Sequence, residues 1–464
     1  MTIPCSTGPD GVAPPNSSGI KVIVVGLGIG GLAAAIECHR KGHAVMAFDK
    51  IPVHTDTHGD LLGISTNSAR VIAKWGEGAI HEILSSVKNA SPATEICDTA
   101  GRTIMPADMT GYKKEDGYWV LRSMLAATLY EHALSLGIDL HVGMDAAVTD
   151  YWETDEEAGV IINGERFAAD CVICCDGINS NGRQIILHED PPLKSTKEYV
   201  FRTSFTTVEL KDDPAARWIL NGMDECDRGK VFKGRGLEVG FSSFENGQTI
   251  VLSDLAMEKL GRPPGSLDDV MQIIADWPIQ RDFAGLLKHI PPLGVIHHPI
   301  ALRDCLKTWI SAGGRTIVIG DAAHSYLPIF GQGGSQAIED AAVLAIALEL
   351  SGKGNVRQAL QFSCRRKPRA TRISEASWAM HNDWYNQDWD AVAKDPKLLK
   401  SSRPGWVLSH DCQAYAYEEY QKVVHAMETN QEYIPTNVPA DGGLGLNEKM
   451  TLTGEMTQAS DVDR

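Results

Sequence analysis

Three short motifs rich in glycine and aspartate, far apart in the sequence, could together bind one dinucleotide. The first, Gly26–Gly31, reads G-x-G-x-x-G and joins a β-branched run to a stretch of helical composition. In such a turn Gly26 permits the tight bend, Gly28 lets a pyrophosphate approach the backbone, and Gly31 lets the helix pack on the strand. The N-terminus of that helix offers free N–H groups and a positive dipole end to phosphates. Asp49 ends the next apolar run, where a carboxylate can accept hydrogen bonds from ribose hydroxyls. This unit predicts a bound dinucleotide, either FAD or NAD.

The second and third motifs each close a short apolar run. Asp176-Gly177 follows the run CVICC, and Gly320-Asp321 follows the run TIVI. The Asp321 carboxylate can accept a hydrogen bond from a ribityl hydroxyl. Together with the first motif, these two pairs point to a single ligand.

A glycine-rich loop after the third motif opens a long helix. Pro328 stiffens this loop, and Gly331, Gly333 and Gly334 lie just before or at the start of the helix. The backbone N–H groups at such a helix start suit a developing anion, such as the N1–C2=O edge of a reduced flavin.

The elements around these motifs predict an α/β fold with an insertion. Lys21–Val25 and Ala44–Phe48 read as buried parallel strands, with a helix over Leu32–Lys41 between them. The chain returns to this sheet at Ala169–Cys175, about 125 residues later, which implies an insertion between elements of one sheet. From Tyr199 to Leu252, aromatic and β-branched residues alternate with polar ones, which is typical of an antiparallel sheet with one buried face.

Composition excludes several kinds of partner. The 464 residues carry a net charge of -17, so we expect no nucleic acid and no docking on anionic membranes. No apolar run reaches the roughly 18 residues that span a bilayer. Cys171 and Cys174 have no second Cys or His pair at zinc spacing, so we expect no metal. The ten scattered cysteines fit a reducing compartment, and residues 1–19 lack the features of a signal peptide, so we expect a cytoplasmic protein.

With these motifs in this order, the sequence resembles class A FAD-dependent aromatic monooxygenases of the salicylate hydroxylase-like and 4-hydroxybenzoate hydroxylase-like superfamily. The resemblance covers about residues 20 to 430 and points to a fungal secondary-metabolite member. It implies that the first motif holds the ADP part of FAD and that Gly320-Asp321 holds the ribityl chain. It also implies that Asp176-Gly177 serves both FAD and NADPH or NADH, the transient electron donor.

The resemblance adds two further cofactor residues. Arg122, near the start of a helix expected over residues 119–136, matches an arginine that contacts FAD in the family. Gly63 lies in the stretch Gly59–Asn67, which matches the loop beside the mobile flavin. The residues expected to bind FAD are therefore Gly26, Gly28, Gly31, Asp49, Gly63, Arg122, Asp176, Gly177, Gly320, Asp321, Pro328, Gly331, Gly333 and Gly334.

The mechanism is also implied by the resemblance. NAD(P)H reduces FAD, the reduced flavin reacts with O2, and the resulting C4a-hydroperoxide hydroxylates or epoxidises an electron-rich aromatic substrate. Arg202 matches a family arginine that orients a phenolate or donates a proton, although a structural salt bridge is the alternative. Arg235, Phe241 and Phe244 are weaker candidates for the same pocket. The chain lacks the proline-containing strand motif of simple phenol hydroxylases near residues 231–245, which favours a larger polycyclic or indole-type substrate.

The expected domains follow from these assignments. They are a flexible tail over residues 1–19, a FAD-binding domain over 20–190 and 301–355, an antiparallel-sheet substrate domain over 191–300, a helical region over 356–435 and a flexible tail over 436–464.

Three other functions are alternatives to a monooxygenase. One is a flavin-dependent dehydrogenase or oxidase of a related small molecule, and another is a non-catalytic FAD-binding protein, which the intact Asp176 and Asp321 argue against. A flavin-dependent halogenase would need a W-x-W-x-I-P motif, which the sequence lacks. The sequence leaves the oligomeric state open.

Overall fold

The computed structural model describes residues 17–52, 61–91, 94–107, 117–188, 193–222, 226–234, 237–245, 249–257, 266–290, 296–395, 398, 404–440, 449–450 and 456–457. Most of the expected tails, and Gly59 of the predicted flavin loop, lie outside these residues. The domain boundaries stay a prediction.

A five-stranded parallel sheet forms the centre of one lobe, in the order β17-β11-β1-β2-β7. Its strands are β1 (Lys21–Val25), β2 (Ala44–Asp49), β7 (Asp139–Val142), β11 (Cys171–Cys174) and β17 (Thr316–Val318). The β-branched and cysteine side chains of β1 and β11 are buried, as expected for a sheet covered on both faces. This sheet confirms the predicted Rossmann-like α/β fold.

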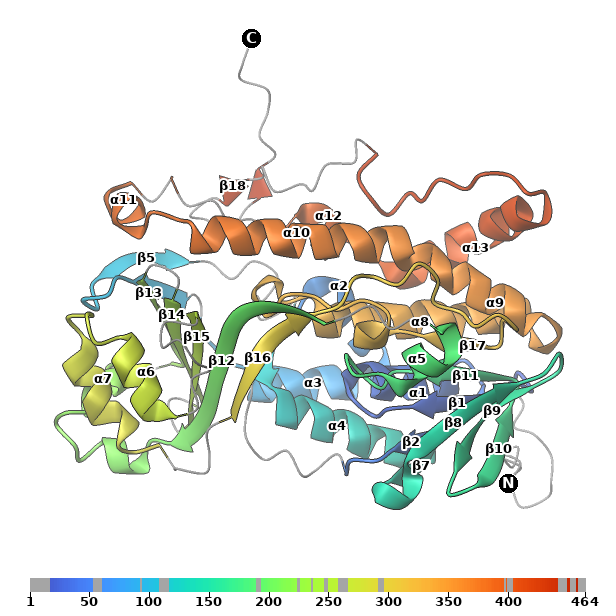
Figure 1. The fold of residues 1–464 in the computed structure, drawn as a ribbon, viewed down its shortest axis with the longest axis horizontal. Coiled ribbons are helices and arrows are strands. Elements are labelled where there is room, and N and C mark those ends of the chain that lie inside the picture. The colour runs from blue at the N-terminus through green and yellow to red at the C-terminus, as the bar shows by residue number, and fades with distance from the viewer. Residues whose placement is uncertain are drawn as a thin grey trace, which may run out of the picture.

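Two long helices lie side by side against this sheet (Figure 1). They are α1 (Ile29–Arg40) and α8 (Gly333–Ser351), and in α8 every residue from Ser335 to Leu348 is buried. Gly30 makes the close approach possible, because a Cβ there would lie 3.0 Å from the Cβ of Ala337. The other sheet face carries the antiparallel strands β8 (Val148–Glu153), β9 (Ala158–Ile162) and β10 (Glu165–Ala169).

A seven-stranded sheet forms the second lobe, in the order β16-β12-β15-β14-β13-β4-β5. Its strands in chain order are β4 (Thr94–Cys97), β5 (Thr103–Ala107), β12 (Lys194–Thr206), β13 (Gly229–Gly234), β14 (Leu237–Phe244), β15 (Thr249–Met257) and β16 (Ile296–Leu302). β12 to β16 fall within the expected antiparallel insertion, apart from the last residues of β16. The edge strands β4 and β5 come from much earlier in the chain, and β4 pairs in parallel with β13.

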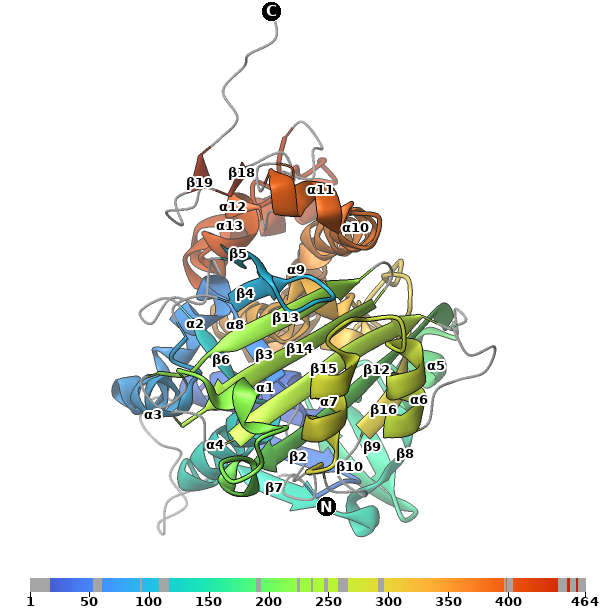
Figure 2. The same ribbon diagram turned by 90° about the vertical axis from the view of Figure 1, so that its left-hand side faces the viewer.

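Helices cover the outer face of this sheet. α6 (Leu267–Ile273) and α7 (Gln280–Leu287) pack there over an aromatic core that includes Phe232, Phe241 and Phe283. Figure 2 shows both helices in front of the strands. The opposite face of the sheet is turned toward the first lobe and α10.

A two-stranded ribbon near the predicted flavin loop packs against α8 and other helices of the first lobe. β3 (Leu61–Ile64) pairs with β6 (Tyr118–Leu121), and Gly63 lies opposite Trp119. The helix expected over 119–136 therefore begins later, as α4 (Arg122–Ser135). Apolar spacing alone was misleading here, because pairing with β3 satisfies the backbone groups of residues 118–121. The remaining helices of this lobe are α2 (Thr66–Ile72), α3 (Ala79–Val87) and α5 (Asn181–Leu187).

The C-terminal part of the chain is largely helical and spans both lobes. Its helices are α9 (Val356–Ser363), α10 (Lys367–Tyr385), α11 (Trp389–Lys394), α12 (Gly405–Leu408) and α13 (Cys412–Glu428), and a short pair β18 (Lys449–Met450) and β19 (Met456–Thr457) follows. Figure 1 shows α10 running from above the large sheet to above α8. Within the described part of the chain, no helix has both the length and the apolar character needed to cross a membrane.

Candidate functional site

The glycine turn after β1 is closely packed at two positions and open at the third. Gly26 has a φ of 90°, and a Cβ there would lie 2.5 Å from the carbonyl oxygen of Cys175. A Cβ on Gly31 would lie 1.7 Å from the carbonyl oxygen of Gly26. By contrast, a Cβ on Gly28 would meet no atom of the residues that the structure describes within 4 Å. The open side at the N-terminus of α1 is therefore a place where a phosphate could approach the backbone.

Asp49, at the end of β2, lies against this turn. Its Oδ2 accepts a hydrogen bond from the Leu27 N–H at 2.6 Å, and its Oδ1 accepts one from the Ile51 N–H at 2.8 Å. These bonds fix the carboxylate, and each oxygen has a further lone pair for a ribose hydroxyl. The sequence did not predict that Asp49 also stabilises the glycine turn by a hydrogen bond to its backbone.

Asp176 offers an unsatisfied acceptor at the end of β11. Its Oδ2 accepts from the Gly182 N–H at 3.1 Å, whereas its Oδ1 is buried and has no hydrogen-bond partner among the described residues. Burial raises the pKa of this carboxyl, opposed by hydrogen bonds from Ser180 and backbone N–H groups. Gly177 has a φ of 78°, and a Cβ there would meet no atom within 4 Å.

The Gly320-Asp321 turn carries an exposed aspartate side chain. Gly320 has a φ of 60°, and its N–H donates to Oδ2 of Asp340 at 3.1 Å. The Asp321 side chain is exposed, yet enough protein surrounds it for desolvation to raise its pKa. The charges of His324 and Arg122 act in the opposite direction and lower that pKa. Arg122, at the first residue of α4, therefore lies close enough to act on Asp321.

The N-terminus of α8 meets both Asp321 and β3. Pro328 begins a 3₁₀ turn, and Gly331 ends it with a φ of 65°. A Cβ on Gly333 would lie 4.0 Å from Oδ1 of Asp321, and one on Gly334 would lie 3.5 Å from Cδ1 of Ile64. The third motif, the helix N-terminus and the β3–β6 ribbon thus lie next to one another.

The second and third motifs are also tied directly to each other. The Arg183 guanidinium is buried and donates to the carbonyl oxygen of Ala322 at 3.1 Å and to that of Asp304 at 3.0 Å. This side chain joins α5, which follows Asp176-Gly177, to the turn that contains Asp321.

These features fit a flavin dinucleotide. The open backbone at Gly28 suits a pyrophosphate, the orphaned oxygen of Asp176 suits a donor group, and the exposed Asp321 suits a ribityl hydroxyl. The free N–H groups at the start of α8 suit the electronegative edge of the flavin ring. Among the described residues, no group of three or more His, Cys, Asp or Glu side chains is arranged to hold a metal ion.

Comparison with known proteins identifies the family. Two family profiles, each described as an FAD binding domain, match residues 21–67 and 302–377. Asperlicin C monooxygenase of Petromyces alliaceus is 42% identical over 453 residues, which cover 96% of this chain and 98% of that protein. The FAD-dependent monooxygenase nanF of Aspergillus nanangensis is 41% identical, over 95% of this chain and 98% of that protein. This chain belongs to the FAD-dependent monooxygenases.

Solved structures agree with this assignment. Native FqzB superposes with a TM-score of 0.83 at 40% identity, over 92% of this monooxygenase and 99% of that chain. CtdE in complex with FAD and a substrate also gives a TM-score of 0.83, at 36% identity, over 88% of this chain and 100% of that one. A salicylate hydroxylase substrate complex shares the fold, with a TM-score of 0.68 at 19% identity over 86% and 98% of the two chains. The resemblance to this family and the FAD cofactor are confirmed.

Arg202 of the monooxygenase lies on the large sheet, in the middle of β12. It pairs with Ser253 of β15 and with Ile296 of β16, and its side chain is half-buried. Alternation along the strand puts Val200 on the same face as Arg202. Val200 packs with Leu327, immediately before Pro328. Arg202 therefore points toward the lobe that carries the flavin motifs.

Of the three other predicted pocket residues, Arg235 lies outside the described residues, and the two phenylalanines lie on opposite faces of β14. Phe241 stacks on Phe283 at 5.4 Å in the core beneath α6 and α7, so it cannot line a pocket on the inner face. Phe244, three residues further along β14, has the opposite orientation and is 2% exposed. Side chains alternate between the two faces of a strand, so position in β14, and not residue type, determines which phenylalanine faces the first lobe.

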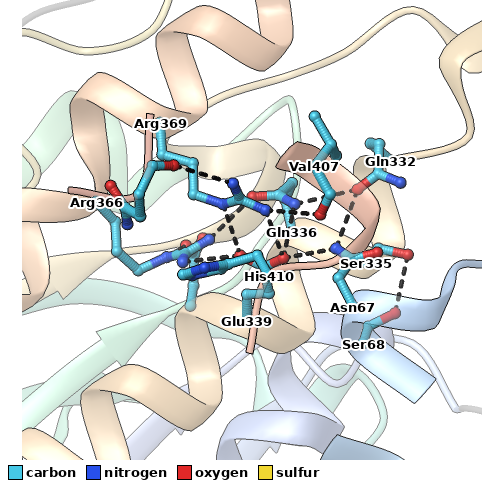
Figure 3. A network of polar contacts seen from close by, with 12 residues as sticks. Asn67, Ser68, Gln332, Ser335, Gln336, Glu339, Arg366, Arg369, Val407 and His410 are labelled. Carbon is cyan, nitrogen blue, oxygen red and sulfur yellow. Dashed lines mark hydrogen bonds and ion pairs between the residues drawn. The ribbon is translucent and has the colours of Figure 1, made fainter. Parts of the chain in front are cut away.

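Sequence reasoning missed a buried polar cluster behind the site (Figure 3). Its members include Asn67, Gln332, Glu339, Arg366 and Arg369. One signal was available, because α8 carries Gln336, Glu339 and Asp340 within an otherwise alanine- and leucine-rich helix. The partners of these groups lie in distant segments, which the sequence pattern did not reveal.

The glycine geometry predicts different outcomes for two similar substitutions. Gly28→Ala should fold normally, because its Cβ enters open space, but should bind FAD at least about tenfold more weakly, because the methyl group occupies the phosphate approach. Gly31→Ala should fail to fold or lose much of its thermal stability, because its Cβ would overlap the Gly26 carbonyl oxygen. Melting temperature and fluorescence titration with FAD would be measured on both. Gly354→Ala, also in open space but away from the site, is the control. Normal FAD affinity in Gly28→Ala would contradict the assignment.

Proposed function

We propose that this monooxygenase uses NADH or NADPH and O2 to hydroxylate or epoxidise an electron-rich aromatic substrate of phenol or indole type. One oxygen atom enters the substrate, the other leaves as water, and NAD(P)H supplies the two electrons. The names of its fungal relatives, one of which acts on asperlicin C, support a substrate from secondary metabolism.

The observation that carries this proposal is the position of Arg202. The half-buried guanidinium belongs to the same sheet face as Val200, which packs on the loop before Pro328. An arginine there can donate a charge-assisted hydrogen bond to a phenolate or carbonyl oxygen. We therefore assign Arg202 as the catalytic residue that orients the ring.

The cofactor residues would hold FAD along one path from β1 to α8. The N-terminus of α1 at Gly28 would bind the pyrophosphate, Asp49 the ribose and Asp321 the ribityl chain. The N–H groups at the start of α8, with Arg122 nearby, would stabilise negative charge on the flavin ring. When bound and reduced, FAD supplies an activated oxygen atom derived from O2.

The electron donor would bind only transiently. The sequence contains no second strand-linked G-x-G-x-x-G turn for a nicotinamide dinucleotide. We propose that Asp176-Gly177 contacts both FAD and NAD(P)H.

The nine described cysteines are all free thiols, which supports a reducing, cytoplasmic setting.

Product analysis of the FAD-loaded protein tests the proposed reaction. A panel of phenols and indole alkaloids would be supplied with NADH or NADPH and isotopically labelled O2. We expect at least one compound to stimulate NAD(P)H oxidation and O2 uptake and to gain one labelled oxygen atom. An oxidised product without the label would indicate a dehydrogenase or oxidase. No stimulation by any compound would favour a non-catalytic FAD-binding protein.

Replacing Arg202 tests its role directly. Arg202→Leu should keep FAD but give about a hundredfold less product, because misplacing a substrate by about 1 Å can cost that much. The electrons from NAD(P)H should then appear as hydrogen peroxide. Thr203→Val is the matched control, since Thr203 is buried on the opposite face and its hydroxyl has no hydrogen-bond partner within the described part of the chain. Normal product per NAD(P)H in a folded Arg202→Leu protein would reject the catalytic role.

A further inference from the structure

Four charged side chains are buried together behind the flavin motifs, where α8 and α10 meet the C-terminal segment. Figure 3 labels Glu339, Arg366 and Arg369 among them. Glu339 and Arg369 are 0% exposed, and Asp340 and Arg366 are 2% exposed. Two carboxylates face two guanidinium groups, so these four charges balance. Removing any one of them would leave a buried charge without its partner, which is costly in a protein interior.

Glu339 is the hub of this cluster. Its Oε1 accepts hydrogen bonds from Asn67 at 2.5 Å, from Gln336 at 3.1 Å and from Nη2 of Arg369 at 3.1 Å. Its Oε2 accepts from Nε of Arg369 at 3.1 Å and forms an ion pair with Nη1 of Arg366 at 2.9 Å. Desolvation alone would raise the pKa of Glu339, but the two guanidinium groups outweigh it and keep the pKa far below the usual range.

Polar side chains connect this hub to the edge of the cofactor site. Asn67 also donates to Oε1 of Gln332 at 3.2 Å, and Gln332 donates to the Ser65 hydroxyl at 2.9 Å. Gln332 immediately precedes the first residue of α8. The hub thus fixes the N-terminus of α8 against the segment that follows β3.

The neighbouring carboxylate reaches the third motif. Asp340 accepts from the Gly320 N–H at 3.1 Å through Oδ2, and from Nε of Arg366 at 2.6 Å through Oδ1. His324 Nε2 lies 2.6 Å from the same Oδ2. Asp340 therefore helps to hold the turn that presents Asp321.

Arg369 connects the hub to the C-terminal segment. Its Nη1 donates to the carbonyl oxygens of Trp406 at 3.3 Å and Asn437 at 3.2 Å, and its Nη2 donates to that of Val407 at 2.9 Å. Arg369 thus links these three residues, which are far from every flavin motif in the sequence, to α8, whose N-terminus faces the site.

We propose that Glu339 and Arg369 are positioning residues for FAD and that the charge balance of this cluster sets the reduction potential of the bound flavin. Glu339 lies six residues inside α8, about 9 Å from its first residue at 1.5 Å per residue. Charges at that range interact appreciably in an interior of low dielectric constant. An excess positive charge favours the reduced, more negative flavin, and an excess negative charge disfavours it. This inference rests on the proposed cofactor path but not on the substrate.

Opposite shifts of the flavin potential test the proposal. Glu339→Gln should raise the midpoint potential of bound FAD, and Arg369→Met should lower it, in an equilibrium titration with a reference dye. Arg369→Lys keeps the charge but loses the planar fork, so it should lower the melting temperature while leaving the potential near that of the wild type. The control is Arg372→Met on the same helix. Because the ion pair between Arg372 and Glu375 is exposed, its loss should change neither the midpoint potential nor the melting temperature.

The directions of the two shifts in midpoint potential distinguish an electrostatic role of the cluster from a merely structural one. Potentials that shift in the same direction, or not at all, in FAD-loaded Glu339→Gln and Arg369→Met would overturn the proposal. If either variant does not fold, Asp340→Asn and Arg366→Met replace them, with the same expected signs and the same contradicting result. The titration uses neither substrate nor NAD(P)H, so its failure would leave the proposed reaction untouched.

Discussion

The close approach of α1 to the turn after β1 is the constraint on which the cofactor site depends. The Gly26 carbonyl oxygen occupies the position that a Cβ on residue 31 would take. A Cβ on Gly26 would in turn overlap the backbone of Cys175. Because the first turn of α1 packs directly on the end of β1, the free N–H groups of that turn lie beside Gly28. The parallel sheet then brings the ends of β2, β11 and β17 to the same edge, with Asp49, Asp176 and Asp321.

Buried polar groups extend this constraint to the rest of the molecule. Arg183 ties the second motif to the third, and Glu339 ties the start of α8 to α2 and to the C-terminal segment. Hydrogen bonds to buried charges are directional and costly to leave unmade, so they define positions more narrowly than apolar packing does. The C-terminal helices, which contribute none of the flavin motifs, are in this way part of the scaffold around the cofactor.

The local motifs could be predicted from the sequence, because a glycine turn between a strand and a helix depends on neighbouring residues. The parallel sheet and the inserted antiparallel sheet followed from apolar runs and alternation. Other features depend on distant partners. Residues 118–121 form β6 because β3 pairs with them, although their spacing suited a helix. The Glu339 cluster joins side chains roughly 30 to 270 residues apart, and no local pattern encodes such contacts.

A crystal structure of the FAD-loaded protein would test most directly whether the three motifs and the inner face of the large sheet form one active site. We predict that the pyrophosphate lies against Gly28, that the ribityl chain contacts Asp321, and that the flavin ring lies between the N-terminus of α8 and the sheet face that carries Arg202. A flavin ring bound away from that face, or a pyrophosphate bound elsewhere, would contradict this account.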